Sequence, residues 1–108
     1  MQTLEQFLAN PSARNAYVKH PGFRSLYIRY TQMCLGRTSA TEWRYARVLQ
    51  IANIEAKKPG KGAFKRLMKQ LESYRPLYVE CVHNQQFANG LRKMGFRQFT
   101  DDPSFILD

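Results

Sequence analysis

A short basic segment rich in glycine is the part of this sequence whose residue types point most directly to a ligand. The chain reads IANIEA over Ile51–Ala56, then KKPGKGAF, then KRLMKQL, which predicts an apolar strand, a tight turn and an amphipathic helix. Such a turn directs backbone N–H groups and a helix N-terminus at one spot, which suits a phosphate or pyrophosphate. The patterns GxxxxGK[ST] and GxGxxG are both absent. Gly60-Lys61-Gly62 alone therefore favours a plain strand-to-helix turn over a phosphate site.

Cysteine and histidine offer weaker chemistry. Cys81 and His83 alternate onto one face of an expected strand, but no orienting group or second ligand pair accompanies them in the sequence. We therefore predict neither a nucleophile nor a metal site. Cys34 and Cys81 lack the density of a disulfide scaffold and are expected to be buried free thiols.

The first half of the chain must position the turn at residues 57–62, which we call the glycine turn. Residues 3–8 and 11–19 are expected to form short helices, and Pro21-Gly22 breaks the chain. Two stretches rich in aromatic and β-branched residues predict strands that pair as a hairpin across a turn at 36–41. These strands are Leu26–Leu35 and Trp43–Ala56.

The second half alternates helices and strands. Phe64, Leu67, Met68 and Leu71 share one helical face, and Leu77–His83 reads as the next strand. A second helix is expected between an N-cap at Asn84 and a terminating Gly95, with its buried stripe at Phe87, Leu91 and Met94. Residues 96–100 and 104–107 predict a terminal hairpin or one strand with an irregular tail. The order predicts an α/β or α+β domain with a mostly antiparallel sheet and a right-handed strand–helix–strand crossover.

Two segments of the chain together resemble the GNAT-type N-acetyltransferases. In that family a turn of the form Arg/Gln-x-x-Gly-x-Gly/Ala follows the fourth strand, and a later segment reads Asn-x-x-Ala-x-x-Leu-Tyr-x-x-x-Gly-Phe. Here Pro59-Gly60-Lys61-Gly62-Ala63-Phe64 falls on the first and Asn84–Phe96 on the second. The resemblance covers roughly residues 48–96.

The resemblance implies a GNAT-like fold, acetyl-CoA as cofactor and acetyl transfer to an amine, such as a protein lysine or N-terminus. It places the coenzyme pyrophosphate on the glycine turn and the pantetheine arm near Asn84, which is also expected to cap its helix. The implied cofactor-binding residues are Ile54, Ala56, Lys57, Gly60, Lys61, Gly62, Ala63, Phe64, Lys65, Asn84 and Phe87. Under this resemblance, N-terminal helices replace the first strands of the family, so a partner subunit is one way to complete the sheet.

The chain departs from the family pattern at several positions. Pro59 stands where Arg or Gln is usual, and Phe64 and Phe87 replace small residues. Lys57, Lys58 or Lys61 offers a replacement for the cationic contact. Leu91 falls where the family often has the Tyr that protonates the leaving thiolate. A catalytically inactive binding protein with this fold is therefore a second hypothesis.

Two carboxylates are candidates for the catalytic base that the resemblance implies. Glu55 lies at the end of the long strand, where alternation places it on one face with Ile51 and Asn53. The alternative is an exposed carboxylate paired with Lys57. Glu80 lies mid-strand between apolar neighbours, where a carboxylate needs a partner. Its alternative role is a buried ion pair, with Arg29, Arg44 or Arg47 as the cation.

The net charge of +9 would attract anions in general. A dense basic run, in which Glu72 is the acidic residue, exceeds what one cofactor needs; it comprises Lys57, Lys58, Lys61, Lys65, Arg66, Lys69 and Arg75. A basic nucleic-acid-binding module is therefore a third hypothesis, although no nucleic-acid motif supports it. Tyr27, Tyr30, Trp43 and Tyr45 are expected to pack in the hairpin, with a base-stacking platform as the alternative.

The length and composition indicate one domain over residues 1–108. The 44% apolar content argues against disorder. No run is long enough to span a bilayer, and no secretory signal precedes the first helix, so a cytoplasmic location is expected. An open sheet edge would make a homodimer plausible.

Overall fold

The computed structural model describes residues 2–9, 16–37, 39–58, 60–80, 82–99 and 103–108. Along the chain the described elements are three α-helices, a 3-10 turn and six strands. In order they are α1 (Leu4–Ala9), β1 (Ala16–Tyr17), β2 (Phe23–Arg37), β3 (Trp43–Ala56), α2 (Ala63–Leu71), η1 (Glu72–Tyr74), β4 (Leu77–Val79), α3 (Gln85–Lys93), β5 (Arg97–Gln98) and β6 (Phe105–Leu107). The fold is mixed α+β.

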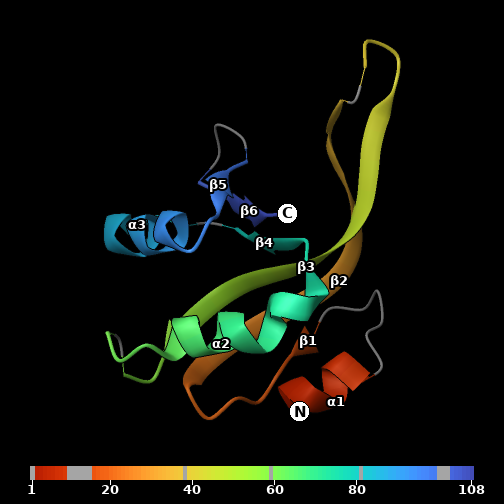
Figure 1. The fold of residues 1–108 in the computed structure, drawn as a ribbon. Helices are drawn as coiled ribbons and strands as arrows, with labels where there is room; N and C mark the ends of the chain where they lie inside the picture. Colours follow the sequence, from red (N-terminus) through yellow and green to blue (C-terminus); the bar gives the residue numbers. More distant parts are fainter. Residues whose placement is uncertain (1, 10–15, 38, 59, 81, 100–102) are drawn as a thin grey trace.

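The described strands form one sheet in the order β1-β2-β3-β4-β6-β5. All neighbours are antiparallel except β3 and β4, which pair in parallel from Leu49–Leu77 to Ile51–Val79. Helix α2 makes the crossover between these two parallel strands (Figure 1). The mostly antiparallel sheet and the strand–helix–strand unit are thus as expected from the sequence.

The N-terminal segment differs from the prediction. The short first helix is confirmed as α1, but the expected helix over 11–19 is wrong at its C-terminal end. There β1 pairs with Tyr27 and Ile28 of β2, and Lys19 bridges to Thr3. The rest of that prediction, 11–15, lies outside the described residues. The N-terminus therefore adds an edge strand to the sheet as well as a helix, because ladder hydrogen bonds to β2 satisfy its backbone.

Strand β3 contains a bulge that changes the predicted face of Glu55. Between the pairs Ser25–Glu55 and Tyr27–Ala52, β2 advances two residues while β3 advances three. The extra residue is accommodated at Asn53, whose φ is 48°, a left-handed conformation that asparagine tolerates better than most residues. Ile51 is buried, whereas Asn53 and Glu55 are exposed. The prediction that these three share a face is therefore wrong.

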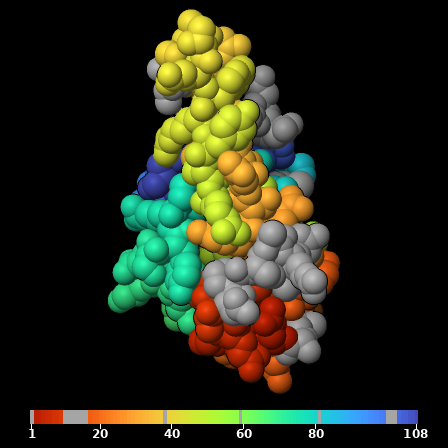
Figure 2. Space-filling view, turned by 90° about the vertical axis from the view of Figure 1, so that its right-hand side faces the viewer, coloured from red at the N-terminus to blue at the C-terminus, as the bar shows by residue number. Residues whose placement is uncertain are grey.

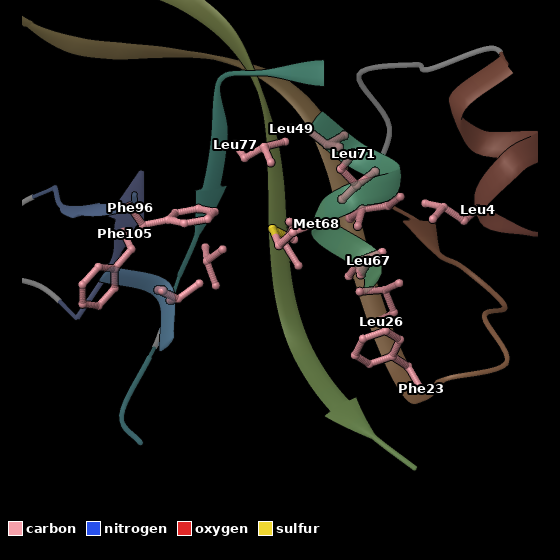
Figure 3. Close-up of a cluster of buried hydrophobic side chains, with 14 of the residues drawn as sticks. Leu4, Phe23, Leu26, Leu49, Leu67, Met68, Leu71, Leu77, Phe96 and Phe105 are labelled. Carbon is pink, nitrogen blue, oxygen red and sulfur yellow. The ribbon is translucent and has the colours of Figure 1, made fainter. Parts of the chain in front are cut away.

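All three described helices pack on one face of the sheet. The main core joins Leu4 and Phe7 of α1, Leu67 and Leu71 of α2, and Ala88 and Leu91 of α3 to inward residues of the strands. Figure 3 shows Leu71 near Leu49 and Leu67 near Leu26, with Met68 between the helix and the strands. The opposite face holds a smaller cluster of Leu35, Val48, Tyr78 and Ile106. Alternation along β3 and β4 separates the two clusters.

The remaining elements mostly follow the sequence. Strand β3 has the predicted bounds, and β5 and β6 form the terminal hairpin. Strand β4 ends at Val79 rather than at His83, because it follows β3 only until the two strands separate. Cys34 is a half-buried free thiol, and Cys81 lies outside the described residues. None of the described helices is long and apolar enough to cross a membrane.

Candidate functional site

A cavity of about 700 Å³ lies where β3, α2 and α3 meet. We call this cavity the cleft. Its walls are the start of β2, the end of β3, residues 57, 58, 60 and 62 of the glycine turn, and the first turns of α2 and α3. The volume falls in the range of about 300–1,000 Å³ that is typical of small-molecule and cofactor sites. The two segments that carry the sequence resemblance thus border a single cavity.

The glycine turn adopts a conformation that requires its glycines. Gly60 and Gly62 have φ of 80° and 78°, values that most side chains disfavour. Nothing lies within 4 Å of a Cβ built on Gly60, so the space beside it is open. Arg66 Nη1 donates a hydrogen bond of 2.9 Å to the Lys61 carbonyl. This contact fastens the turn to the first turn of α2.

The N-terminus of α2 opens into the cleft. The first hydrogen bond within the helix runs from Arg66 N–H to the Gly62 carbonyl, at 3.1 Å. Helix geometry therefore leaves the N–H groups of Ala63, Phe64 and Lys65 without partners inside the helix. The N-cap is Gly62, which supplies no side-chain acceptor, and all three residues line the cleft. Such an end is a ready-made site for an anion.

The cleft exists because β3 and β4 separate. The Glu80 N–H donates to the Ile51 carbonyl at 3.2 Å, and no backbone hydrogen bond joins the two strands past it in the described residues. Beyond the bulge, the Lys57 N–H donates a hydrogen bond to the carbonyl of Gly22, which directly precedes β2. Alternation then places the backbone groups of Ile54 and Ala56 on the free edge. Both residues line the cleft.

Helix α3 supplies the other wall. The Asn84 side chain accepts a 3.0 Å hydrogen bond from Phe87 N–H, which confirms the predicted N-cap. Gly95, with φ of 97°, follows the C-cap residue Met94, as expected. The rings of Phe87 and Phe64 meet edge to face with centroids 4.7 Å apart. The large residues that replace small ones in the family pattern therefore pack against each other.

Cations dominate the charged residues that border the cleft. Arg24, Lys57, Lys58 and Lys65 line it, together with the Glu55 carboxylate. Lys61 is exposed but does not line the cleft. It is the exception among the predicted cofactor residues, since the other ten all line the cavity. The site therefore has a positive field beside an open helix N-terminus.

The two candidate carboxylates are placed very differently. Glu55 lies at the rim, where its Oε1 is 3.7 Å from Arg24 Nη1. The cation is Arg24 rather than the predicted Lys57. Glu80 is half-buried and is not among the residues that line the cleft. In the described residues it joins no ion pair, and Arg29 instead hydrogen-bonds Gln50 while Arg47 stacks on Tyr30. Of the two, Glu55 alone can reach a ligand in the cleft.

Several residues of the cleft lay outside the sequence-based prediction. Phe23 and Arg24 border it because Gly22, beside them, packs close to α2: a Cβ on Gly22 would lie 3.4 Å from the Ala63 Cβ. The break at Pro21-Gly22 was a visible signal, but its proximity to the turn is a tertiary feature. Gln86, Gly90 and Met94 also line the cleft. Gly90 and Met94 follow Phe87 by three and seven residues, and this helical spacing was the available signal for them.

Other candidate chemistry gains no support from the geometry. The described residues contain no group of three or more His, Cys, Asp or Glu side chains that would hold a metal ion. His83 is exposed, and its predicted companion Cys81 lies outside the described residues. His20 has a structural role, since its Nδ1 accepts from Gly22 N–H and its Nε2 lies 3.0 Å from Gln70 Oε1. It ties the loop before β2 to α2.

Comparisons with known proteins do not name a family for this chain. No protein-family model matches it, and no curated protein or solved structure matches it either. The case for a function therefore depends on the cleft and on the resemblance of its two bordering segments.

Proposed function

We propose that this protein binds acetyl-CoA in the cleft and transfers the acetyl group to an amine. The observation that carries the proposal is the convergence of the glycine turn and α3 on one cavity of about 700 Å³. Helix α2, η1 and β4 separate these two segments in the chain. Their convergence is the arrangement that the GNAT resemblance requires, and neither segment alone would support it.

The phosphate end of the cofactor is assigned to the glycine turn and α2. The N–H groups of Ala63, Phe64 and Lys65 and the positive end of the helix dipole suit a pyrophosphate. Lys57, Lys58 and Lys65 border the same space and supply compensating charge. Pro59, where the family has Arg or Gln, lies outside the described residues. The neighbouring lysines offer the cationic contact instead.

The acyl end is assigned to the gap between β3 and β4. Backbone groups of Ile54 and Ala56 lie along its free edge, where they can pair with the amides of an extended pantetheine arm. An N–H group on this edge can also polarise the thioester carbonyl as negative charge develops on its oxygen. The bulge at Asn53 makes this edge available, because it resets which backbone groups face away from β2.

Acyl transfer requires that the amine lose a proton and that the thiolate leave. Glu55, at the rim of the cleft, is the residue we assign as the base that accepts the amine proton. The carbon–nitrogen bond forms as the carbon–sulfur bond breaks, and the acetyl group passes to the amine. A free thiol has a pKa near 8.5, so the sulfur can depart as a thiolate and take a proton from water.

A second candidate function is cofactor binding without catalysis. Leu91 occupies the position of the usual acid and is 0% exposed, in the core. Glu80 does not line the cleft. Among the described residues, the lining of the cleft thus includes one carboxylate, Glu55, and no tyrosine hydroxyl. If Glu55 does not accept the amine proton, the site can bind the cofactor but has no residue to catalyse transfer.

Isothermal titration with acetyl-CoA is the first test, and we expect saturable binding. Gly60→Val should weaken it more than tenfold, because a β-branched residue cannot keep the positive φ of the turn. Gly36→Val is the matched control, since Gly36 also has positive φ, 119°, but lies on the β2–β3 hairpin. No heat at millimolar acetyl-CoA, or equal affinity of the Gly60→Val variant, would refute the proposed site.

Turnover separates the two candidate functions. Thiol release from acetyl-CoA would be followed with amines, peptides and proteins, and the acetylated product identified by mass spectrometry. Product formation supports the transferase. Tight binding with no turnover on any of these acceptors supports the binding protein.

A further inference from the structure

The β2–β3 hairpin extends past the rest of the sheet as an arm, which we define as residues 32–47 with Thr38 excluded. Among the described residues, β3 pairs with β4 only at Leu49–Ile51, and β1 pairs with β2 only at Tyr27–Ile28. The paired strands of the arm therefore have no neighbour in the described sheet. Figures 1 and 2 show it rising beyond the helices, and the molecule measures 45 × 32 × 20 Å.

One face of the arm carries aromatic rings and guanidinium groups. Trp43, Tyr45 and Arg47 alternate onto this face along β3. Arg37 pairs with Trp43 across the strands and places its Cζ 4.3 Å from the centre of the indole. Arg47 lies over the Tyr30 ring at 4.6 Å. We call Arg37, Trp43, Tyr45 and Arg47 the aromatic strip.

Packing does not account for the aromatic strip. Trp43 and Tyr45 are 52% and 59% exposed, among the most exposed large apolar residues described. The other face of the arm is the one that packs, because Met33, Leu35 and Ala46 contact the small cluster around Val48. That anchoring holds the arm on the sheet. The exposed rings are thus presented on a supported ribbon.

We propose that the aromatic strip binds single-stranded nucleic acid. Residues two apart on a strand are about 7 Å apart, close to twice the roughly 3.4 Å spacing of stacked bases. A base can therefore enter between Trp43 and Tyr45 and contact both rings. Arg37 and Arg47 flank these rings and reach phosphates. Exposed aromatics interleaved with arginine are what sequence-tolerant binding of single strands uses.

The charge of the arm favours a nucleic acid strand over an apolar partner at the aromatic strip. The arm carries Arg37, Arg44 and Arg47, with Glu42 as its acidic residue in the described part, and all four are exposed. The whole chain has a net charge of +9, which favours approach to a polyanion. The strip is distinct from the cleft, since none of its residues lines that cavity. The inference therefore does not depend on the proposed acetyl-CoA site.

The only tryptophan of the chain lies in the strip, so intrinsic fluorescence reports on the site directly. The probe is a fluorescein-labelled oligothymidylate of roughly 12 nucleotides, which fits one binding module, added to the full-length protein. We expect salt-dependent anisotropy changes with the labelled strand, and quenching of Trp43 by the unlabelled strand. Absence of binding at low salt, or tighter binding of a duplex of the same charge, would overturn the proposal.

Variants on the arm separate stacking from charge. Tyr45→Ala should weaken binding about 5- to 160-fold, as expected for loss of one stacked base. Arg47→Gln should weaken it and lower the salt slope by about 0.7 for the lost phosphate contact. The matched control for Tyr45→Ala is Tyr17→Ala, an exposed tyrosine that pairs with Tyr27 on the other face of the sheet. The matched control for Arg47→Gln is Arg44→Gln, on the other face of the arm. Unchanged affinity of Tyr45→Ala, or equal losses for Arg44→Gln and Arg47→Gln, would overturn the proposal.

Discussion

The Phe64 and Phe87 rings meet edge to face across the cleft, with centroids 4.7 Å apart and an interplanar angle of 84°. Phe64 belongs to the first turn of α2 and Phe87 to the first turn of α3. The contact therefore joins the two helix starts that border the proposed cofactor site. Both rings are half-buried and pack against the main core. Their pairing links the two walls of the cleft.

We predict that Phe64 and Phe87 are energetically coupled. Edge-to-face pairs contribute about 0.5–1.5 kcal/mol beyond the burial of their area. A double-mutant cycle with Phe64→Leu and Phe87→Leu, measured by urea unfolding, should give a coupling energy in that range. Leucine keeps most of the apolar volume, so the cycle isolates the ring contact. Strictly additive losses would show that the rings pack independently.

Replacing glycine by alanine should change the stability of the protein in opposite directions at the glycine turn and in α3. Gly62→Ala is expected to destabilise the protein by about 1–2 kcal/mol, because alanine is strained at positive φ. Gly90 lies within α3, where nothing stands within 4 Å of an added Cβ. Gly90→Ala should therefore stabilise the protein by roughly 0.5–1 kcal/mol. Thermal unfolding of both variants and the wild type measures the two changes in stability. Changes in the same direction would contradict the described backbone conformation.

The cap at Asn84 should be replaceable by aspartate. Asn84→Ala removes the acceptor for Phe87 N–H and is expected to cost about 1 kcal/mol of stability. Asn84→Asp keeps the acceptor and places a negative charge at a helix N-terminus, so its stability should be near the wild-type value. Chemical unfolding of both variants tests this expectation. Acetyl-CoA titration of the aspartate variant then reports on any cofactor contact apart from capping.

Elements defined by local patterns were predictable. The bounds of β3 were read from an uninterrupted run without Pro or Gly, and the buried positions Leu67, Met68 and Leu71 of α2 from their spacing. The cap at Asn84 and the end at Gly95 follow from side-chain chemistry within a few residues. Ten of the predicted cofactor residues line one cavity. Their chemical role remains a prediction.

Features set by distant partners were not predictable. Strand β1 consists of two residues, and its pairing with Tyr27 and Ile28 is what makes it a strand. The bulge at Asn53 carries no glycine or proline as a marker, yet it reverses the faces of the residues that follow it. The pairing of Glu55 with Arg24 depends on that reversal. Such features arise from strand pairing between segments far apart in the sequence.

Glu55→Gln should separate catalysis from stability. The Glu55–Arg24 pair is solvent-exposed, with side chains 61% and 67% exposed, so its loss should change the free energy of unfolding by less than about 1 kcal/mol. If Glu55 accepts the amine proton, kcat with an accepted amine should fall roughly 100-fold or more while acetyl-CoA affinity is retained. Arg24→Gln is the matched control, because it breaks the same ion pair but keeps the carboxylate. Equal kcat losses in both variants, or an unchanged kcat for Glu55→Gln, would remove Glu55 from the mechanism.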